Sequence, residues 1–600
     1  MGDADTSGWV VAPSRYIAGR PAEMAVPAPW SCYLAMPDGV RLAVDVYAHS
    51  GRRPTLLIAT PYYRRAARVA GSAAEVAPNI AKYRDAFVPR GYNLVAVDVR
   101  GSGASFGTRD AFRSPRERAD LGVLADWIVA QPWSDGRIGS TGISYLGAGA
   151  DFLASTGHPS VRAVAPISAV WDTWRDNYWP GGILLTELVT TYERLMQGLD
   201  RNRREWLAGL GTFAEPDYLG PLAVDGDDGS LLAAAIAEHA GSFSQARFMA
   251  EFPFRDSTLP YDAGFTPNAF SPCGYAASIP EDVAVYSVGG WTDGAGYANG
   301  AIARFLTLAK NPRHLLIGPW DHGARTNCSP WRGRVEPEFD IMAELVRFFD
   351  HYLMQRQTGL DREAAVHVFS QGDECWLAAG AWPVAEGHFS RHLRPDGALG
   401  EAAAGVTVHA TDPRAGTGGA TRYERIAGLP VTHPYASWPA EDALRASWTS
   451  EKLSAGLRLA GHGVVELTVE SSEPDAAIFL YLLDVAPDGT VRYVTEGMLR
   501  ALHRAEVEPP ANQRAAWPFH AATRAMAAPM PRGEAVPMRV VLLPVAWRFA
   551  AGHRVRLSLA GSDADHAMAV PHGRPPVLRV AGDSRLVLPM LRHGDEGQGG

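Results

Sequence analysis

The first part of the chain alternates short apolar runs with amphipathic segments. Thr55–Thr60, Leu94–Val99 and Val161–Ile167 are short apolar runs bounded by Gly, Pro or charged residues. Runs of this kind are typical of strands buried on both faces of a sheet. Ser114–Glu117 carries a helix-start signal, because Ser caps the helix, Pro follows it and Glu lies three residues on. Alternating strands and helices predict an α/β fold with a mostly parallel sheet.

The pattern changes after residue 170. From about Trp171 to Cys273 the strand signals fade. Leu184–Leu195 and Leu231–Ala240 have helical spacing and are separated by Gly and Asp/Pro breaks, which predicts a helical insertion. Strands return at Val283–Val288 and His314–Ile317, and an amphipathic helix is expected over Glu338–Leu353. We therefore expect a first core segment at residues 1–170, a helical cap at 171–276 and a second core segment at 277–357.

Short alternating strands separated by turn signals dominate the rest of the chain, which is typical of a sandwich or jelly roll. We expect residues 358–600 to form an all-β jelly-roll domain. Its predicted strands are Ala364–Phe369, Gly463–Glu470, Ala477–Val485, Val491–Thr495, Met538–Pro544, Arg554–Ala560 and Arg585–Leu588.

Composition narrows the function classes. The chain has 600 residues, of which 46% are hydrophobic and 20% charged, so wholesale disorder is excluded. A net charge of −9 without a basic face argues against a nucleic-acid partner. The four cysteines are far apart and form no CxxC pair, which disfavours a disulfide framework or a structural metal site. No cofactor is expected, since the chain has no P-loop or dinucleotide fingerprint.

Targeting signals are not recognisable. No apolar stretch of 18 residues occurs, and the first residues lack a signal-peptide pattern. We expect a cytoplasmic protein with no membrane partner, and the possibility of a homo-oligomer stays open.

The first candidate for chemistry is Ser144, in Gly142-Ile143-Ser144-Tyr145-Leu146-Gly147. The segment follows a predicted strand and precedes a helix rich in small residues, as a nucleophile elbow requires. Its second glycine comes one residue later than in G-x-S-x-G, so an ordinary glycine-rich turn with a capping serine is the alternative. Ser105, in Gly103-Ala-Ser-Phe-Gly107, matches that motif letter for letter. It lacks the strand-turn-helix context, and we favour Ser144.

Two further candidates follow predicted strands. Asp293 comes after Val283–Val288 and His322 after His314–Ile317, where open α/β sheets place their ligands. Each has an ordinary alternative, as a turn residue or a buried histidine. Together with Ser144 they have the chain order of α/β-hydrolase triads. Asp321 adjoins His322, but adjacent side chains rarely face each other, so Asp293 is preferred.

These residue types suit acyl transfer. A serine hydroxyl attacks only if a base takes its proton, which a neutral His322 can do while Asp293 orients the imidazole. The tetrahedral intermediate also needs hydrogen-bond donors. The Tyr145 amide is the expected first donor, and the Tyr62 phenol, in a loop after an early strand, is a candidate for the second.

The chain resembles the cocaine esterase and X-Pro dipeptidyl-peptidase-like serine hydrolases, the CocE/NonD family. The similarity covers nearly the whole chain from about Tyr16, and the late glycine after Ser144 is a trait of that family. The segments that carry it are Thr60–Tyr62, Asp98–Gly103, Trp133–Gly136, Gly142–Gly147, Gly290–Gly294 and Gly318–His322.

The resemblance implies an α/β-hydrolase core, a helical cap and a C-terminal jelly roll. It implies Ser144, His322 and Asp293 as catalytic residues, with Tyr62 and the Tyr145 amide as the oxyanion hole. A set of aromatic residues could line an acyl pocket or simply pack in the core: Trp171, Trp174, Tyr178, Trp179, Trp291 and Trp320.

The expected substrate is a small ester or amide. Relatives that bind a free amino group carry extra acids near the site, whereas Gly294–Gly296 offers none. Asp172, Asp176 or Glu187 of the cap could still supply one. An ester with an uncharged acyl group is therefore the first choice, and an X-Pro peptidase or amide acylase with the same triad is the alternative. A non-catalytic protein with a ligand-binding jelly roll is the alternative of another class.

Overall fold

The fold of the first part of the chain is built on a ten-stranded sheet. The structure is a computed structural model that describes residues 8–332, 336–425, 438–439 and 442–591. The strand order is β1-β2-β5-β3-β6-β7-β9-β10-β11-β12, and the strands from β5 to β11 pair in parallel. The strands are β1 (Trp30–Ala35), β2 (Arg41–Tyr47), β3 (Arg53–Thr60), β5 (Asn93–Asp98), β6 (Ser134–Ile143), β7 (Val161–Ile167), β9 (Ala284–Gly290), β10 (Arg313–Gly318), β11 (Val366–Ser370) and β12 (Cys375–Ala379).

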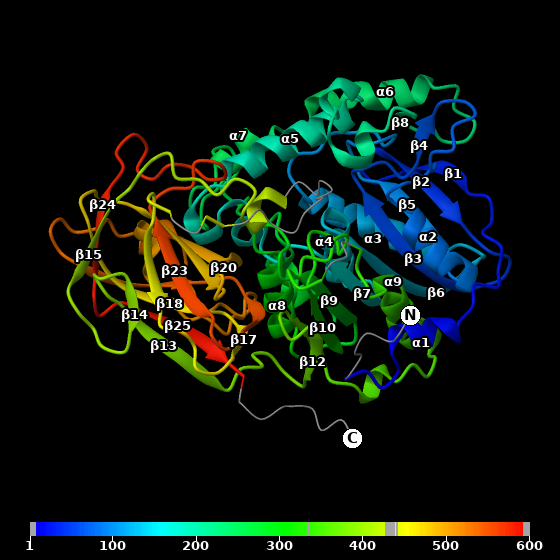
Figure 1. Ribbon diagram of the computed structural model, residues 1–600. Coiled ribbons are helices and arrows are strands. Elements are labelled where there is room, and N and C mark those ends of the chain that lie inside the picture. The colour runs from blue at the N-terminus through cyan, green and yellow to red at the C-terminus, as the bar shows by residue number, and fades with distance from the viewer. Residues whose placement is uncertain (1–7, 333–335, 426–437, 440–441, 592–600) are drawn as a thin grey trace.

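Helices cover both faces of this sheet (Figure 1). One group comprises α1 (Pro13–Ala18), α2 (Ala81–Phe87) and α9 (Ile341–Met354), and the other α3 (Pro115–Val129), α4 (Tyr145–Ser155) and α8 (Tyr297–Thr307). The predicted start of α3 is confirmed, because Ser114 Oγ accepts the Glu117 N–H at 3.4 Å. The central strands are apolar on both sides because helices bury both faces.

A helical segment lies between β7 and β9 in the chain. It contains a π-helical turn (Trp174–Tyr178), α5 (Thr186–Asp200), α6 (Ser230–Glu238) and α7 (Gln245–Ala250). A short strand, β8 (Tyr218–Pro221), pairs with β4 (Ala66–Arg68) of the core. In Figure 1 these helices run across the top of the molecule, from the α/β part to the β-rich part. A helical insertion after β7 agrees with the sequence prediction, and its bounds at residues 171 and 276 stay a prediction.

The C-terminal part is all-β. Its thirteen strands form one branched sheet that encloses a separate apolar core containing Trp448, Trp547 and many aliphatic side chains. The strands are β13 (Gly387–Leu393), β14 (Ala398–Gly400), β15 (Val406–Ala410), β16 (Ala446–Ser450), β17 (Leu457–Gly461), β18 (Val464–Ser471), β19 (Ala477–Val485), β20 (Val491–Arg500), β21 (Val536–Val541), β22 (Val545–Phe549), β23 (Arg554–Ala560), β24 (Val577–Ala581) and β25 (Arg585–Met590).

One predicted strand belongs to the other sheet. Ala364–Phe369 was expected in the jelly roll, but β11 pairs in parallel with β10, and β12 pairs with β11. The α/β sheet therefore continues past residue 357. Alternation along a strand shows that one face is more buried than the other, and it does not show which sheet the strand joins. A domain boundary at residue 358 stays a prediction.

Candidate active site

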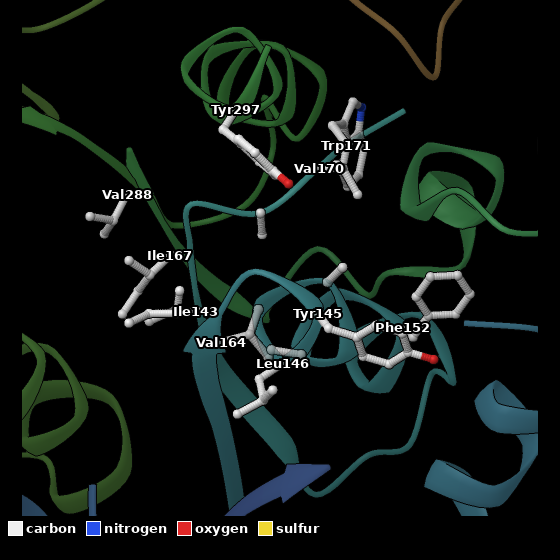
Figure 2. Close-up of a cluster of buried hydrophobic side chains, with 14 of the residues drawn as sticks. Ile143, Tyr145, Leu146, Phe152, Val164, Ile167, Val170, Trp171, Val288 and Tyr297 are labelled. Carbon is white, nitrogen blue, oxygen red and sulfur yellow. The ribbon is translucent and has the colours of Figure 1, made fainter. Parts of the chain in front are cut away.

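Ser144 lies on a sharp turn between β6 and α4. Its backbone has φ 62° and ψ −117°, a conformation that costs a non-glycine residue of order 1–3 kcal/mol. The turn leaves no room beside it, because a Cβ at Gly142 would lie 2.2 Å from Leu146 Cβ and one at Gly147 would lie 2.6 Å from the Gly142 carbonyl oxygen. Figure 2 shows the apolar side chains that hold the turn, including Ile143, Leu146 and Ile167. Close packing around the turn therefore holds Ser144 in its strained conformation.

His322 and Asp293 form a direct hydrogen bond. The distance from His322 Nδ1 to Asp293 Oδ1 is 2.7 Å, and both side chains are buried. With Nδ1 engaged by the carboxylate, Nε2 is the nitrogen available to a serine hydroxyl.

The loops that carry these two residues are joined to each other. They follow the neighbouring parallel strands β9 and β10, and Thr292 donates to the Trp320 carbonyl oxygen at 2.8 Å through its Oγ1. Two glycines at the strand ends allow this approach. A Cβ at Gly290 would lie 2.2 Å from the Trp320 oxygen, and one at Gly318 would lie 2.4 Å from the Trp320 ring. The two loops therefore pack together and position Asp293 and His322 relative to each other.

Tyr62 lies in the loop after β3. Its phenol oxygen is 2.7 Å from that of Tyr192, which belongs to α5 of the cap. Burial raises the pKa of the Tyr62 phenol, and hydrogen bonds with Tyr192 and Ser144 act in the opposite direction. The Tyr62 hydroxyl is thus bonded to the cap, and Tyr62 lines the same cavity as the candidate nucleophile.

Tyr145 is the first residue of α4, so its amide lies at the positive end of that helix. Its side chain points away from Tyr297 and towards Phe152 in Figure 2. The phenol donates to Glu117, whose two carboxylate oxygens lie 2.6 and 2.7 Å away. Burial raises the pKa of this carboxyl to about 7. The backbone of Tyr145 faces the turn, whereas its side chain braces α4 against α3.

Ser144, His322 and Tyr62 line the same cavity, which has a volume of about 710 Å³. Its wall combines core loops with the cap, and most of its surface is apolar. Besides these three residues, the lining includes Phe112, Arg113, Asn177, Tyr178, Leu188, Tyr192, Phe213 and Tyr297.

Of the six aromatic residues expected in an acyl pocket, Tyr178 lines this cavity. The five tryptophans pack elsewhere in the described part of the chain. Trp174 donates to the Phe252 carbonyl oxygen and Trp179 to that of Met249, both inside the cap. Trp171 donates to the Asn512 oxygen, Trp291 donates to the Phe369 oxygen, and Trp320 packs against Phe339 and Trp376. Core packing, the alternative interpretation, describes these five.

The competing candidates have structural roles. Ser105 is buried, donates to the Asp98 carbonyl oxygen at 2.6 Å and accepts the Ala43 N–H at 2.8 Å. Asp321 accepts the backbone N–H groups of Arg325 and Thr326, and thereby closes the loop after His322.

The three cap acids are not among the described residues that line the cavity. Asp176 binds the amides of Trp171 and Asp172, Asp172 pairs with Arg255, and Glu187 accepts from Thr191. Sequence reasoning missed Tyr192 and Arg113, both of which line the cavity. Neither carries a local signal, since each reaches the site only through the folding of distant segments.

No metal-binding group of three or more His, Cys, Asp or Glu side chains occurs among the residues that the structure describes. Over the same residues, no helix is long and apolar enough to cross a membrane.

Comparison with known proteins places this chain in a family. Residues 38–324 match the X-Pro dipeptidyl-peptidase (S15 family) model, and residues 358–581 match the X-Pro dipeptidyl-peptidase C-terminal non-catalytic domain. A protein of Mycobacterium bovis named as a serine esterase is 36% identical, over 94% of this chain and 95% of its own length. Cocaine esterase of a Rhodococcus strain is 25% identical over 88% of this chain and 89% of its own.

The fold is also found in solved structures. A CocE/NonD family hydrolase from Staphylococcus aureus superposes with a TM-score of 0.67 at 18% identity, covering 93% of both chains. The chain therefore belongs to the family of serine hydrolases that includes cocaine esterase and the X-Pro dipeptidyl-peptidases.

Proposed function

We propose that the protein hydrolyses carboxylic esters through an acyl-enzyme intermediate. Ser144 Oγ attacks the ester carbonyl, while His322 takes the serine proton and then returns a proton to the leaving alcohol. Water then attacks the acyl-enzyme with His322 again as the base, which releases the acid. The observation that carries the proposal is the 2.7 Å bond from His322 to buried Asp293, beside a cavity that Ser144 and His322 share.

The oxyanion of each tetrahedral intermediate has two proposed donors, the Tyr145 amide and the Tyr62 hydroxyl. A phenol is a suitable donor here because burial raises its pKa and keeps it protonated. In this proposal Tyr192 is the donor of the 2.7 Å bond between the two phenols, which leaves the Tyr62 proton for the intermediate. Removing one such donor typically costs about 10²–10³ in rate.

The ester preference rests on the charges around the cavity. An X-Pro peptidase must hold the free amino group of its substrate, and acids are needed to pair with that ammonium. The three cap acids considered from the sequence are occupied elsewhere, and Glu215 is the one acidic residue among the described residues that line the cavity. An amide or X-Pro substrate is the second candidate, supported by the family model that matches residues 38–324.

The test compares 4-nitrophenyl butyrate with alanyl-proline 4-nitroanilide. We expect the ester to be turned over with a kcat/KM at least about 100 times that of the anilide, and Ser144→Ala to abolish that turnover. Fast anilide cleavage with little ester cleavage would replace the ester proposal by the peptidase. Ester turnover that Ser144→Ala leaves intact would refute the proposed nucleophile.

A further inference from the structure

Arg113 is a buried cation in the wall of the catalytic cavity. It lies in the loop between β5 and α3, is 6% exposed and lines the cavity together with Ser144 and His322. A guanidinium is always charged, so its burial requires compensation by an anion or by a full set of hydrogen bonds.

The other buried arginines meet that requirement within the protein. Each of the other eight buried arginines in the described part of the chain has a carboxylate within 4.0 Å, whereas Arg113 has none there. The eight pairs are Arg64–Asp45, Arg65–Asp45, Arg100–Asp120, Arg109–Asp200, Arg255–Asp172, Arg304–Asp151, Arg347–Glu344 and Arg422–Glu496. The exception is thus the buried arginine that faces the candidate active site.

The contacts of Arg113 leave its charge largely uncompensated. Nη2 reaches Thr173 Oγ1 at a long 3.4 Å, Nε has no partner among the described residues, and the guanidinium lies 4.8 Å from the Tyr145 ring centroid. Glu117, four residues along the chain, has both oxygens on the Tyr145 phenol. Burial raises the pKa of Glu117 to about 7, so part of its own charge is lost near neutral pH.

The backbone does not explain an arginine at this position. Arg113 has φ 43°, in the left-handed region that glycine adopts at least cost. Its N–H donates to the Tyr145 hydroxyl at 3.1 Å, a bond that any residue except proline could make. The feature that only arginine supplies at this position is therefore a guanidinium charge in the wall of the cavity.

From this exception we propose that the substrate is an ester bearing a carboxylate, and that Arg113 binds this carboxylate. The proposal rests on the ester hydrolysis proposed above and names its substrate class. Arginine pairs with a carboxylate through two parallel hydrogen bonds, and the pair is strong where water is excluded. Hydrolysis of a dicarboxylic monoester consumes one water and releases the dicarboxylate and the alcohol. This charge-bearing group replaces the uncharged acyl group that the sequence favours.

The first experiment compares two acyl chains of equal length in the full-length protein. The probes are 4-nitrophenyl hydrogen adipate, which is anionic, and methyl 4-nitrophenyl adipate, its neutral ester. We expect the wild type to prefer the anion by at least about tenfold in kcat/KM, and Arg113→Met to reduce that ratio by about 10–100-fold. Arg113→Lys should retain part of the preference. A 3-carboxy-4-nitrophenyl butyrate probe places the carboxylate on the alcohol side instead, and an Arg113-dependent preference for this probe rather than for the adipate probe would overturn the acyl-side placement.

Lys82 provides the matched control, because it also lines the cavity and its side chain is more exposed than that of Arg113, while desolvation in the cavity wall lowers the pKa of its ammonium to about 7. Lys82→Gln should change the anion-to-neutral ratio by less than about threefold, since the Lys82 ammonium is partly neutral near pH 7 and its remaining charge is partly screened by water. An equal fall for both probes in Arg113→Met would mean that the arginine stabilises the oxyanion, and would overturn the proposal. Absence of any Ser144-dependent ester turnover would instead refute the proposed function.

A second measurement needs no variant. Adipate should inhibit wild-type hydrolysis of 4-nitrophenyl butyrate competitively, and at least about tenfold more strongly than adipamide at matched ionic strength. Equal inhibition by the dianion and the diamide would contradict the proposal whatever the Arg113 variants do.

Discussion

Two glycine-flanked serines of this chain differ in whether the hydroxyl lies at a cavity or inside a loop. The Ser105 segment matches the nucleophile motif letter for letter, yet its hydroxyl is buried and makes two hydrogen bonds to the backbone. The Ser144 segment departs from the motif, yet it forms the strained turn between a strand and a helix at the wall of a cavity. The difference lies in the backbone around each serine, and the spacing of the glycines is secondary.

The glycines serve different purposes in the two segments. In the Ser105 loop, a Cβ at Gly103 would lie 2.3 Å from the Asp98 carboxylate, which there pairs with Arg64. At the Ser144 turn, Gly142 and Gly147 instead let α4 start directly against β6 and β7. One set of glycines closes a structural loop, and the other allows the turn that exposes a hydroxyl.

The largest expected effect comes from Ser144→Ala, compared with Ser105→Ala. Ser144→Ala should lower kcat for 4-nitrophenyl butyrate by about 10⁴–10⁶, because the nucleophile is lost. Its free energy of unfolding should stay within about 1 kcal/mol of the wild type. Turnover and urea denaturation of both variants measure this contrast, and a similar loss of activity in both variants would break it.

Asp293→Asn should have the next largest effect. An asparagine keeps the shape but favours the wrong imidazole tautomer, so kcat should fall by about 10³–10⁴. Asp321→Asn is the matched control, because Asp321 binds backbone amides of the same loop, and it should lose less than about tenfold. Steady-state kinetics on 4-nitrophenyl butyrate decides between the two acids. A greater loss for Asp321→Asn would transfer the orienting role to that residue.

Tyr62→Phe should lower kcat by about 10²–10³ and change KM little, because the oxyanion exists only in the transition state and intermediate. Tyr192→Phe should cost about tenfold or less, since it removes the partner of Tyr62 and leaves the proposed donor in place. The double variant should be no worse than Tyr62→Phe alone, because the two hydroxyls act as one unit. Independent, multiplicative losses would show that Tyr192 has a separate role.

Ser105→Ala should have the smallest effect on catalysis. It removes a buried hydroxyl that satisfies the Ala43 N–H and the Asp98 carbonyl oxygen, so the free energy of unfolding should fall by about 1–3 kcal/mol. Activity per folded molecule should remain within about twofold. Urea denaturation and active-site titration together measure this, and unchanged stability would refute the structural role given to Ser105.

Much of the fold could be predicted from local patterns. The predicted strands near residues 55, 94, 161, 284 and 314 all form, and the start of α3 follows its capping signal. The sheet to which β11 belongs could not be predicted, because alternation reports burial and not the pairing partner. The sequence also could not show which aromatic residues line the cavity and which pack in the core. Tryptophans that fill a core and tyrosines that line a cavity have the same local sequence signal, and only long-range packing separates them.

The candidate site also contains residues that the sequence predicted and residues that it could not predict. Ser144, Asp293 and His322 each follow the end of a predicted strand. This context and their order along the chain were sufficient to propose them as candidates. Tyr192 and Arg113 reach the cavity from segments with no such signal, and Tyr192 meets Tyr62 across 130 positions of the chain. That Arg113 has no carboxylate within 4.0 Å among the described residues stands out only when the other eight buried arginines are compared with it.

The most direct test of the central claim is labelling with a fluorophosphonate followed by peptide mapping. The reagent bonds covalently to a serine only where a neighbouring base makes the hydroxyl nucleophilic. We expect one adduct, on the peptide that contains Ser144, and its loss in a His322→Ala variant that remains folded. An adduct on Ser105, or no adduct on folded wild-type protein, would contradict the account.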